Sequence, residues 1–381
     1  MTVFLLACGH LLSDFYSNFL PILLPVIMPK LGLSLTLSGL LVFVMSFTSN
    51  LLQPFIGYFM DKRNFAWLLV PSVPFGAFVI CNIGYVDTQP ALFLVIALTG
   101  LSVSAFHPLA SSLVGRTADP HKMGSAMSYF IAGGNLGFAL SPIILAQFIE
   151  QFSMAWLPVF IAPSLLLALA YHRSPLPHLS TVQEAGTKQA GRLSLNAPLL
   201  LLNAAMGCRT WAYMTAANYL PLYLIAHGVA STLSGVMLTL LLAGGVAGGL
   251  FGGWMGDRIG HRRIMAGLLT LALLPLWCFY GSELLTPLAI VSLFFCGFCL
   301  QGPQPSSVVW AQRLLPNNAA VASGMMMGLS FGLGSIGTAI TAALADRIGL
   351  DAALLWSLVP VIVAALLVMM VRLPERCATN N

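Results

Sequence analysis

Charged residues are scarce in this chain. Asp, Glu, Lys and Arg make up only 7% of its 381 residues, whereas hydrophobic residues make up 58% and the mean hydropathy is +0.91. Soluble proteins carry about 25% charged residues, so a soluble domain of this length could not cover its surface with so few. The composition excludes a soluble protein and predicts a chain that crosses the membrane many times.

Several catalytic motifs are also missing. The sequence holds no HExxH, no GxSxG and no P-loop, which argues against a metalloprotease, a serine hydrolase and an ATPase. The seven cysteines are scattered, and Cys296 and Cys299 lie in an apolar run without a second pair, which favours buried free thiols over a metal site. We therefore expect no enzyme and no cofactor. The net charge of +5 is explained by membrane topology, so we also expect no nucleic-acid partner.

Long apolar runs are what the chain has instead. A membrane helix needs about 20 residues, and a β-barrel would show short segments of alternating polarity. The runs predict an all-α membrane protein with twelve transmembrane helices, at residues 2–29, 35–60, 65–86, 90–115, 123–149, 153–172, 197–227, 231–256, 263–281, 284–311, 319–345 and 351–372.

Basic residues concentrate on one side of the predicted membrane. With the N-terminus in the cytoplasm, thirteen of the sixteen Lys and Arg fall in cytoplasmic loops or in the C-terminal tail, and only Lys30 and Arg347 fall outside. Cytoplasmic loops of membrane proteins are enriched in Lys and Arg. We therefore expect both termini, and the polar linker 173–196, to be cytoplasmic.

The two halves of the chain repeat. "LGLSLTLSGLLVF" at 31–43 aligns with "HGVASTLSGVMLT" at 227–239, and "GYFMDKR" at 57–63 aligns with "GWMGDRI" at 253–259, both at an offset of 196. "HPLASSLVGR" at 107–116 aligns with "QPSSVVWAQR" at 304–313 at an offset of 197. An even number of helices makes the copies parallel, as in one plan of secondary transporter. We predict two pseudo-symmetric six-helix bundles, 1–172 and 197–372, joined by the linker 173–196 and followed by a tail at 373–381.

These motifs carry a family resemblance. "GGWMGDRIGHRR" at 252–263 resembles the loop signature of the major facilitator superfamily, and a degenerate copy, "GYFMDKRN", follows the second predicted helix. "GSAMSYFIAGGNLGFALSP" is similar to the antiporter motif of proton-coupled exporters, with Ser141 in place of the usual Gly before Pro142. Together with "LLQPFIGYFMDKR" and "AFHPLASSLVGR", it looks most like the fosmidomycin-resistance exporters. The resemblance implies alternating access by rocking of two six-helix bundles.

Two charges lie deep in symmetry-related helices. Asp14, in "GHLLSDFYSNFLP", lies about twelve residues or ~18 Å into the first helix, and Arg209 lies equally deep in the seventh. A charge at the bilayer centre costs at least ~2.5–3.5 kcal/mol, so each must face a partner or a cavity. One interpretation is a structural ion pair between the halves. The other is that Asp14 carries a proton and Arg209 holds an anion.

Two histidines accompany the acid, and uncharged polar residues accompany the arginine. His10 shares a helix face with Asp14, and His107, before the helix-bending Pro108, titrates near neutral pH where its repeat position, Gln304, does not. The predicted proton-coupling residues are Asp14, His107 and His10. The predicted substrate-binding residues are Arg209, Tyr213, Asn18, Asn50, Gln53, Asn135, Asn218, Gln301 and Gln304, although Asn and Gln also join membrane helices to one another.

Two further carboxylates end the second and eighth helices. Asp61 and Asp257 can meet basic residues and the N-terminus of a neighbouring helix. Such contacts would hold the two halves together while the outside is open, whereas a solvated turn would only set topology. The predicted conformational latch consists of Asp61, Lys62, Arg63, Asp257, Arg258, Arg262 and Arg263.

The sequence thus predicts a transporter driven by the proton gradient. We expect a monomer in the cytoplasmic (inner) membrane that exports a small molecule, with an anionic, drug-like compound as the candidate substrate, in exchange for protons. The alternative is uptake of a small organic anion by proton symport. A channel or a receptor is harder to exclude from sequence, but saturable flux that responds to a proton gradient would separate a transporter from both.

The topology is open to a direct test. Reporter fusions or cysteine labelling at positions 88, 184 and 376 should find position 88 outside and the other two inside, because the basic residues lie with the latter. External access at 184 or 376 would contradict the topology.

Overall fold

Every regular element that the structure describes is helical. The computed structural model describes residues 2–179 and 196–371, and these ranges contain no strand. Most of the predicted linker and the whole predicted tail lie outside the described residues. The α-helices are α1 (Thr2–Ser17), α2 (Phe19–Leu31), α3 (Leu35–Ser46), α4 (Gln53–Lys62), α5 (Leu69–Cys81), α6 (Gln89–Thr117), α7 (Met123–Gln151), α8 (Ile161–His172), α9 (Ala197–Ala226), α10 (Ser231–Ile259), α11 (His261–Gly281), α12 (Pro287–Gln301), α13 (Pro303–Leu314), α14 (Ala319–Gly324), α15 (Ser330–Ile348), α16 (Leu350–Leu355) and α17 (Leu358–Met370).

Short segments of other helix types connect them. The 3₁₀ segments are η2 (Ala66–Leu68), η3 (Ile83–Tyr85), η4 (Pro120–Lys122), η5 (Met154–Phe160), η6 (Leu176–His178) and η7 (Pro316–Asn318). The π segments are η1 (Phe47–Leu51) and η8 (Met325–Leu329). π segments inside α-helices are frequent at functional sites.

The predicted membrane helices are present. Eleven helical stretches among the described residues are long and apolar enough to cross a membrane. The remaining predicted span, the seventh, is the 30-residue α9, which is long enough but carries Arg209 among its apolar residues. The first span comprises α1 and α2, which separate at Asn18, because Pro21 has no N–H to continue the helix ladder. The prediction of an all-α, twelve-helix membrane protein is confirmed.

The chain forms two compact units, which follow the predicted halves except at two segments. The first unit is Met1–Ala118, Tyr129–Leu193 and Leu315–Gly328, and the second is Asp119–Ser128, Ser194–Leu314 and Leu329–Asn381. The start of α7 therefore belongs with the second half of the sequence, and α14 with η8 belongs with the first. The carboxylates of the predicted latch account for both segments, as described below.

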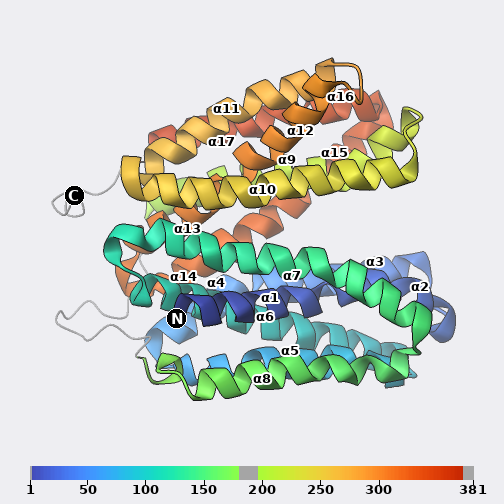
Figure 1. The fold of residues 1–381 in the computed structure, drawn as a ribbon, viewed down its shortest axis with the longest axis vertical. Helices are drawn as coiled ribbons and strands as arrows, with labels where there is room; N and C mark the ends of the chain where they lie inside the picture. The colour runs from blue at the N-terminus through green and yellow to red at the C-terminus, as the bar shows by residue number, and fades with distance from the viewer. Residues whose placement is uncertain (1, 180–195, 372–381) are drawn as a thin grey trace. The chain divides into compact units, whose positions relative to one another are not determined.

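Glycines let α7 approach α1 closely within the first unit. A Cβ at Gly133 would lie 2.4 Å from the carbonyl oxygen of Ala7, and one at Gly137 would lie 1.9 Å from that of Leu11. In the same unit α1 also packs on α5, α6 and α8 (Figure 1). Small residues at such contacts are the usual device of membrane helix packing, where backbones meet at short distance.

The second unit uses the same device between α10 and α12 (Figure 1). Gly244, Gly248 and Gly252 lie four residues apart, so they share one helix face. A Cβ on each would meet the backbone carbonyl of Phe294, Phe298 or Gly302 at 2.0, 2.0 or 1.9 Å. This contact fixes α12, and with it the polar residues at its end.

Adjacent glycines on α10 give a matched test of this packing. Gly248→Ala should destabilise the protein by about 1–3 kcal/mol, because the added methyl group overpacks against backbone that cannot move aside. Gly249→Ala should not destabilise it, because a Cβ there meets nothing within 4 Å and alanine is the better helix former. Thermal unfolding of both variants in one detergent measures the difference. Equal melting temperatures would contradict the close approach of α10 and α12.

Candidate proton and anion sites

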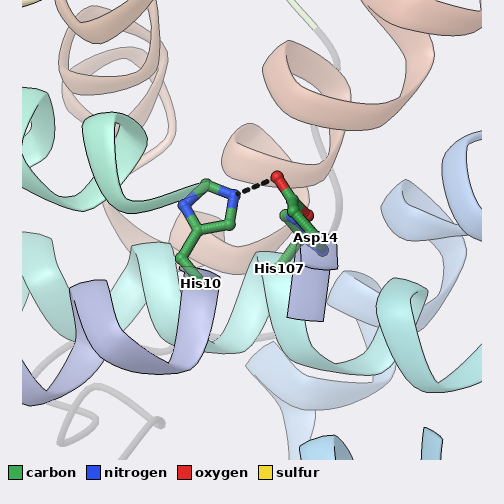
Figure 2. A group of neighbouring side chains, drawn as sticks. All are labelled: His10, Asp14 and His107. Atoms are coloured by element: carbon green, nitrogen blue, oxygen red, sulfur yellow. Dashed lines mark hydrogen bonds and ion pairs between the residues drawn. The ribbon is translucent and has the colours of Figure 1, made fainter. Parts of the chain in front are cut away.

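An acid and two histidines meet inside the first unit. Asp14 and His10 lie on α1 and His107 lies on α6, and Figure 2 shows the three side chains gathered together. Asp14 Oδ1 lies 3.0 Å from His107 Nε2, and Asp14 Oδ2 lies 3.3 Å from His10 Nε2. One ring nitrogen of each histidine and one carboxylate oxygen of Asp14 all lie within 4.8 Å of one another. The predicted proton-coupling residues are therefore brought to one place, which we call the acid cluster (Asp14, His10 and His107).

The imidazole rings are held by backbone and by aromatic rings. His10 Nδ1 lies 2.8 Å from the carbonyl oxygen of Phe130 on α7, and His107 Nδ1 lies 2.9 Å from that of Val103 one turn earlier on α6. His10 stacks on Phe130 with ring centroids 4.2 Å apart. The two imidazoles are buried, whereas the Asp14 side chain keeps 20% of its surface exposed. Asp14 is thus the least buried residue of the acid cluster.

An arginine is enclosed by neutral acceptors in the second unit. Arg209, on α9, is fully buried. Its Nη1 donates to the Gln301 side chain and, at 3.0 Å, to the carbonyl oxygen of Leu300, and its Nη2 donates to Gln304 Oε1 at 2.5 Å and to Thr210 Oγ1 at 2.8 Å. We call Arg209, Gln301 and Gln304 the arginine site.

The positive charge of the arginine site is not neutralised by those acceptors. The ion pairs found among the described residues include none to Arg209, and its Nε–H is buried with no hydrogen-bond partner. Tyr213 joins the same network through a hydrogen bond with Gln301. A buried cation without a counter-ion is costly, and the guanidinium plane offers paired donors to carboxylates and phosphonates. The arrangement therefore suits an anion.

The two sites occupy corresponding positions in the repeat. His107 and Gln304 are equivalent at the offset of 197, and each contacts the charged residue on the first helix of its own half. α6 runs unbroken through Pro108, whereas its repeat breaks at Gly302 into α12 and α13. Asp14 has its partners in the first unit and Arg209 in the second, so a pair between these two residues remains a prediction.

The other predicted substrate residues lie in varied settings. Asn18 donates to the carbonyl oxygen of Phe138, and Gln53 donates to that of Ser49, contacts that also suit a role in joining or bracing helices. Gln53 Oε1 is buried and has no hydrogen-bond partner within the described part of the chain. Asn50 lies in η1, Asn135 is half-buried on α7, and Asn218 is exposed on α9. Their contact with substrate remains a prediction.

Asp61 caps a helix from the other half of the sequence within the first unit. Its two carboxylate oxygens accept from the backbone N–H groups of Ala320 at 3.0 Å and Val321 at 2.9 Å, at the start of α14. Gly57, one turn before Asp61, allows the approach, because a Cβ there would lie 2.6 Å from the carbonyl oxygen of Ala320. A carboxylate is favoured at this end of a helix, where N–H groups are unpaired.

Asp257 makes the symmetry-related contact within the second unit. It accepts from the backbone N–H of Gly124 at 2.7 Å, and from the N–H and hydroxyl of Ser125 at 2.8 and 2.7 Å. Gly253 lies against Gly124, as Gly57 lies against Ala320. The predicted contact of both carboxylates with a helix N-terminus is therefore confirmed. These contacts explain why 119–128 and 315–328 change units.

Two basic residues outside the predicted set interact with the two carboxylates. Arg116 interacts electrostatically with Asp61, and Arg313 with Asp257. Sequence analysis missed both, although they end the aligned stretches 107–116 and 304–313.

Three of the predicted basic residues contact an aromatic ring or a backbone carbonyl. Lys62 lies over the Tyr58 ring at 4.1 Å, and Arg258 lies over the Trp254 ring at 3.6 Å. Arg262 donates to the carbonyl oxygen of Met369, and Arg63 and Arg263 are exposed.

The capping contacts predict a stability difference between carboxylates. Asp61→Asn and Asp257→Asn should each cost about 1–3 kcal/mol, because an amide cannot accept at both atoms and leaves a backbone N–H unpaired. The matched control is Asp87→Asn, since Asp87 is 81% exposed and pairs with Lys30 at the surface; there we expect less than about 1 kcal/mol. Thermal unfolding in detergent would show this, and equal losses in all three variants would contradict the capping role.

Comparison with known proteins identifies the family. The model of the Major Facilitator Superfamily matches residues 6–337. The fosmidomycin resistance protein of Escherichia coli (strain K12) is 27% identical over 370 residues, which is 91% of this chain and 86% of that protein. An uncharacterized MFS-type transporter of Bacillus subtilis (strain 168), YfnC, is 26% identical over 353 residues, covering 90% of this chain and 85% of that protein.

Solved structures agree on the fold. The structure of the E. coli fucose:proton symporter FucP matches with a TM-score of 0.79 at 15% identity, over 97% of this chain and 98% of that one. Members of the family are transporters rather than enzymes, and they carry small molecules across the bilayer by alternating access. This multi-pass membrane protein belongs to the Major Facilitator Superfamily.

Proposed function

We propose that this transporter exports a small anionic molecule in exchange for protons. The observation that carries the proposal is the arginine site, a fully buried guanidinium whose partners in its own unit are neutral. The proton gradient would supply the energy, so no cofactor is needed. The transported molecule and protons are the proposed ligands, and a monomer is the proposed working form.

The anion follows from charge and geometry. Placing a cation in a membrane protein without a counter-ion costs several kcal/mol, and a bound anion would offset that cost in each cycle. The free Nε–H of Arg209 is an unused donor on the edge of the guanidinium plane. The side-chain oxygens of Gln301 and Gln304 accept from Arg209 and hold its guanidinium plane in place.

The proton is assigned to the acid cluster. Imidazole is the side chain that titrates near neutral pH, and two imidazoles here meet one carboxylate. Ionisable residues inside membrane segments commonly form proton relays in transporters. Gain or loss of a proton at Asp14 would change the charge that α1 presents to α6.

Export is favoured over uptake by one relative. The E. coli protein that is 27% identical is named for resistance to fosmidomycin, and expulsion of a toxic compound is a direct route to resistance. The Asp61 and Asp257 caps join segments from opposite halves of the sequence. We assign them the role of the latch, formed in one access state and broken in the other.

A sensitivity screen tests the proposal. We would express the chain in cells that lack their own exporters and measure growth on anionic compounds, including fosmidomycin, other phosphonates and carboxylates, with matched neutral compounds as controls. Reduced sensitivity to anions alone, and faster export from vesicles when the opposite side is acidified, are the expected results. Increased sensitivity would indicate uptake by symport instead, and protection against neutral compounds alone would contradict an anion site.

Arg209 provides the sharpest single variant. Arg209→Lys keeps the charge but loses the planar pair of donors, so we expect binding of the transported anion to weaken at least tenfold, or about 1.4 kcal/mol. Binding to the purified protein measures this, with Arg262→Lys as the control, since Arg262 is exposed and donates to a backbone carbonyl. Unchanged affinity in Arg209→Lys would remove Arg209 from the anion site.

A further inference from the structure

The hydrogen bonds of the two histidines fix where their protons lie. A backbone carbonyl oxygen can only accept a hydrogen bond. Because His10 Nδ1 and His107 Nδ1 each face such an oxygen, at 2.8 and 2.9 Å, each Nδ1 carries a hydrogen. The nitrogen that gains or loses a proton is therefore Nε2 in both rings.

Both Nε2 atoms point at the same carboxylate, through different oxygens. His107 Nε2 lies 3.0 Å from Asp14 Oδ1, and His10 Nε2 lies 3.3 Å from Asp14 Oδ2 (Figure 2). An ionised carboxylate can only accept, and a bare Nε2 can only accept. Each of the two contacts therefore needs one proton between its atoms. If Asp14 itself carried a proton, that proton would satisfy one contact, and the other contact would still need a second one. The cluster therefore holds two exchangeable protons whether Asp14 is ionised or protonated.

Among the residues that the structure describes, the cluster has no third ionic partner. The helices packed on α1 are α2, α5, α6 and α8, and α7 contributes the carbonyl of Phe130. The other ionisable side chains on these helices, on α1 itself and on the helices that pack on α6 include Cys8, Tyr16, Lys30, Tyr58, Asp61, Lys62, Cys81, Arg116, Tyr129, Glu150, Tyr171 and His172. Among the described residues, the electrostatic interactions of Asp14 come from His10 and His107, and that of His107 comes from Asp14.

The α7 side of the cluster is closed at short range. A Cβ on Gly134 would lie 2.4 Å from His10 Nε2 and 2.6 Å from Asp14 Oδ2. The His10 ring also lies near Phe106 and stacks on Phe130, with ring centroids at 6.4 and 4.2 Å. Little room remains beside the contact between His10 and Asp14, so the small size of a proton suits this position.

We propose that the acid cluster is a two-proton site in which His10 and His107 each share one exchangeable proton with Asp14. This inference rests on the proposed proton coupling and deepens it, because it makes His10 a proton carrier in its own right. The loaded cluster has two imidazolium groups and one carboxylate, a net charge of +1, and the empty cluster has a net charge of −1. The cluster therefore changes by two charges when it empties.

A second proton alters the energetics of transport. With the membrane potential held at zero, a pH difference of one unit balances about a tenfold substrate gradient if one proton is exchanged, since each tenfold step is 1.4 kcal/mol. Two protons raise this to about 100-fold.

Nitrogen NMR of the histidines tests the proton count without a substrate. The full chain would be labelled with ¹⁵N-histidine, placed in lipid nanodiscs with a metal chelator, and titrated with acid. His10→Gln and His107→Gln assign the two signals, and His121→Gln, at an exposed residue of η4, is the control. We expect Nδ1 of both rings to carry hydrogen throughout, and both Nε2 atoms to be protonated together at the acid end. In Asp14→Asn the doubly protonated pair should disappear at the same pH.

Two results would overturn the inference. One is a single imidazolium, with the other Nε2 bare over the whole range in which the protein stays folded. The other is an Nε2 signal of a metal-bound imidazole that only the chelator removes, because a metal ion would then take the place of the protons. Two protonated rings in a protein whose transport ignores pH gradients would leave the two-proton site standing and refute the proposed function.

Discussion

An ionised side chain inside a membrane must find a partner or lose its charge, and this constraint organises both units of the protein. Asp14 meets it with two imidazoles, which can neutralise the carboxylate by sharing protons. Arg209 meets it with amide and hydroxyl oxygens that satisfy its hydrogen bonds but leave its charge in place. One unit therefore holds a charge that protons can change, and the other holds a charge that an anion can cancel.

Duplication explains why the two sites correspond. The first and fourth helices of each half supply the charged residue and its polar partner, but His107 is replaced by Gln304 in the second half. An imidazole titrates near neutral pH and an amide does not, so the charged residue of the proposed proton site has a titratable partner, whereas that of the proposed anion site has a neutral one. The carboxylates Asp61 and Asp257 kept the same role in both copies, and each caps a helix start encoded in the other half.

Much of this architecture is readable from the sequence, because lipid imposes strict rules. Span lengths, the repeat and the deep positions of Asp14 and Arg209 follow from hydropathy and from the rise of a helix. The partners of those residues do not follow, since depth says nothing of which helix face meets which neighbour. The proton positions on His10 depend on the carbonyl of Phe130, which is 120 residues away in sequence. The electrostatic interaction of Arg116 with Asp61 likewise depends on the tertiary fold, although the repeat aligns Arg116 with Arg313.

Separating exchange from accumulation tests the central claim, that the acid cluster couples protons to movement of an anion held at Arg209. Vesicles would contain either the natural chain or Asp14→Asn, with an anionic compound shown to be transported. Exchange of labelled for unlabelled compound needs no net proton movement, whereas accumulation driven by a pH gradient does. The account predicts that Asp14→Asn keeps exchange and loses accumulation, while the natural chain performs both. Accumulation by Asp14→Asn that still follows the pH gradient would contradict it.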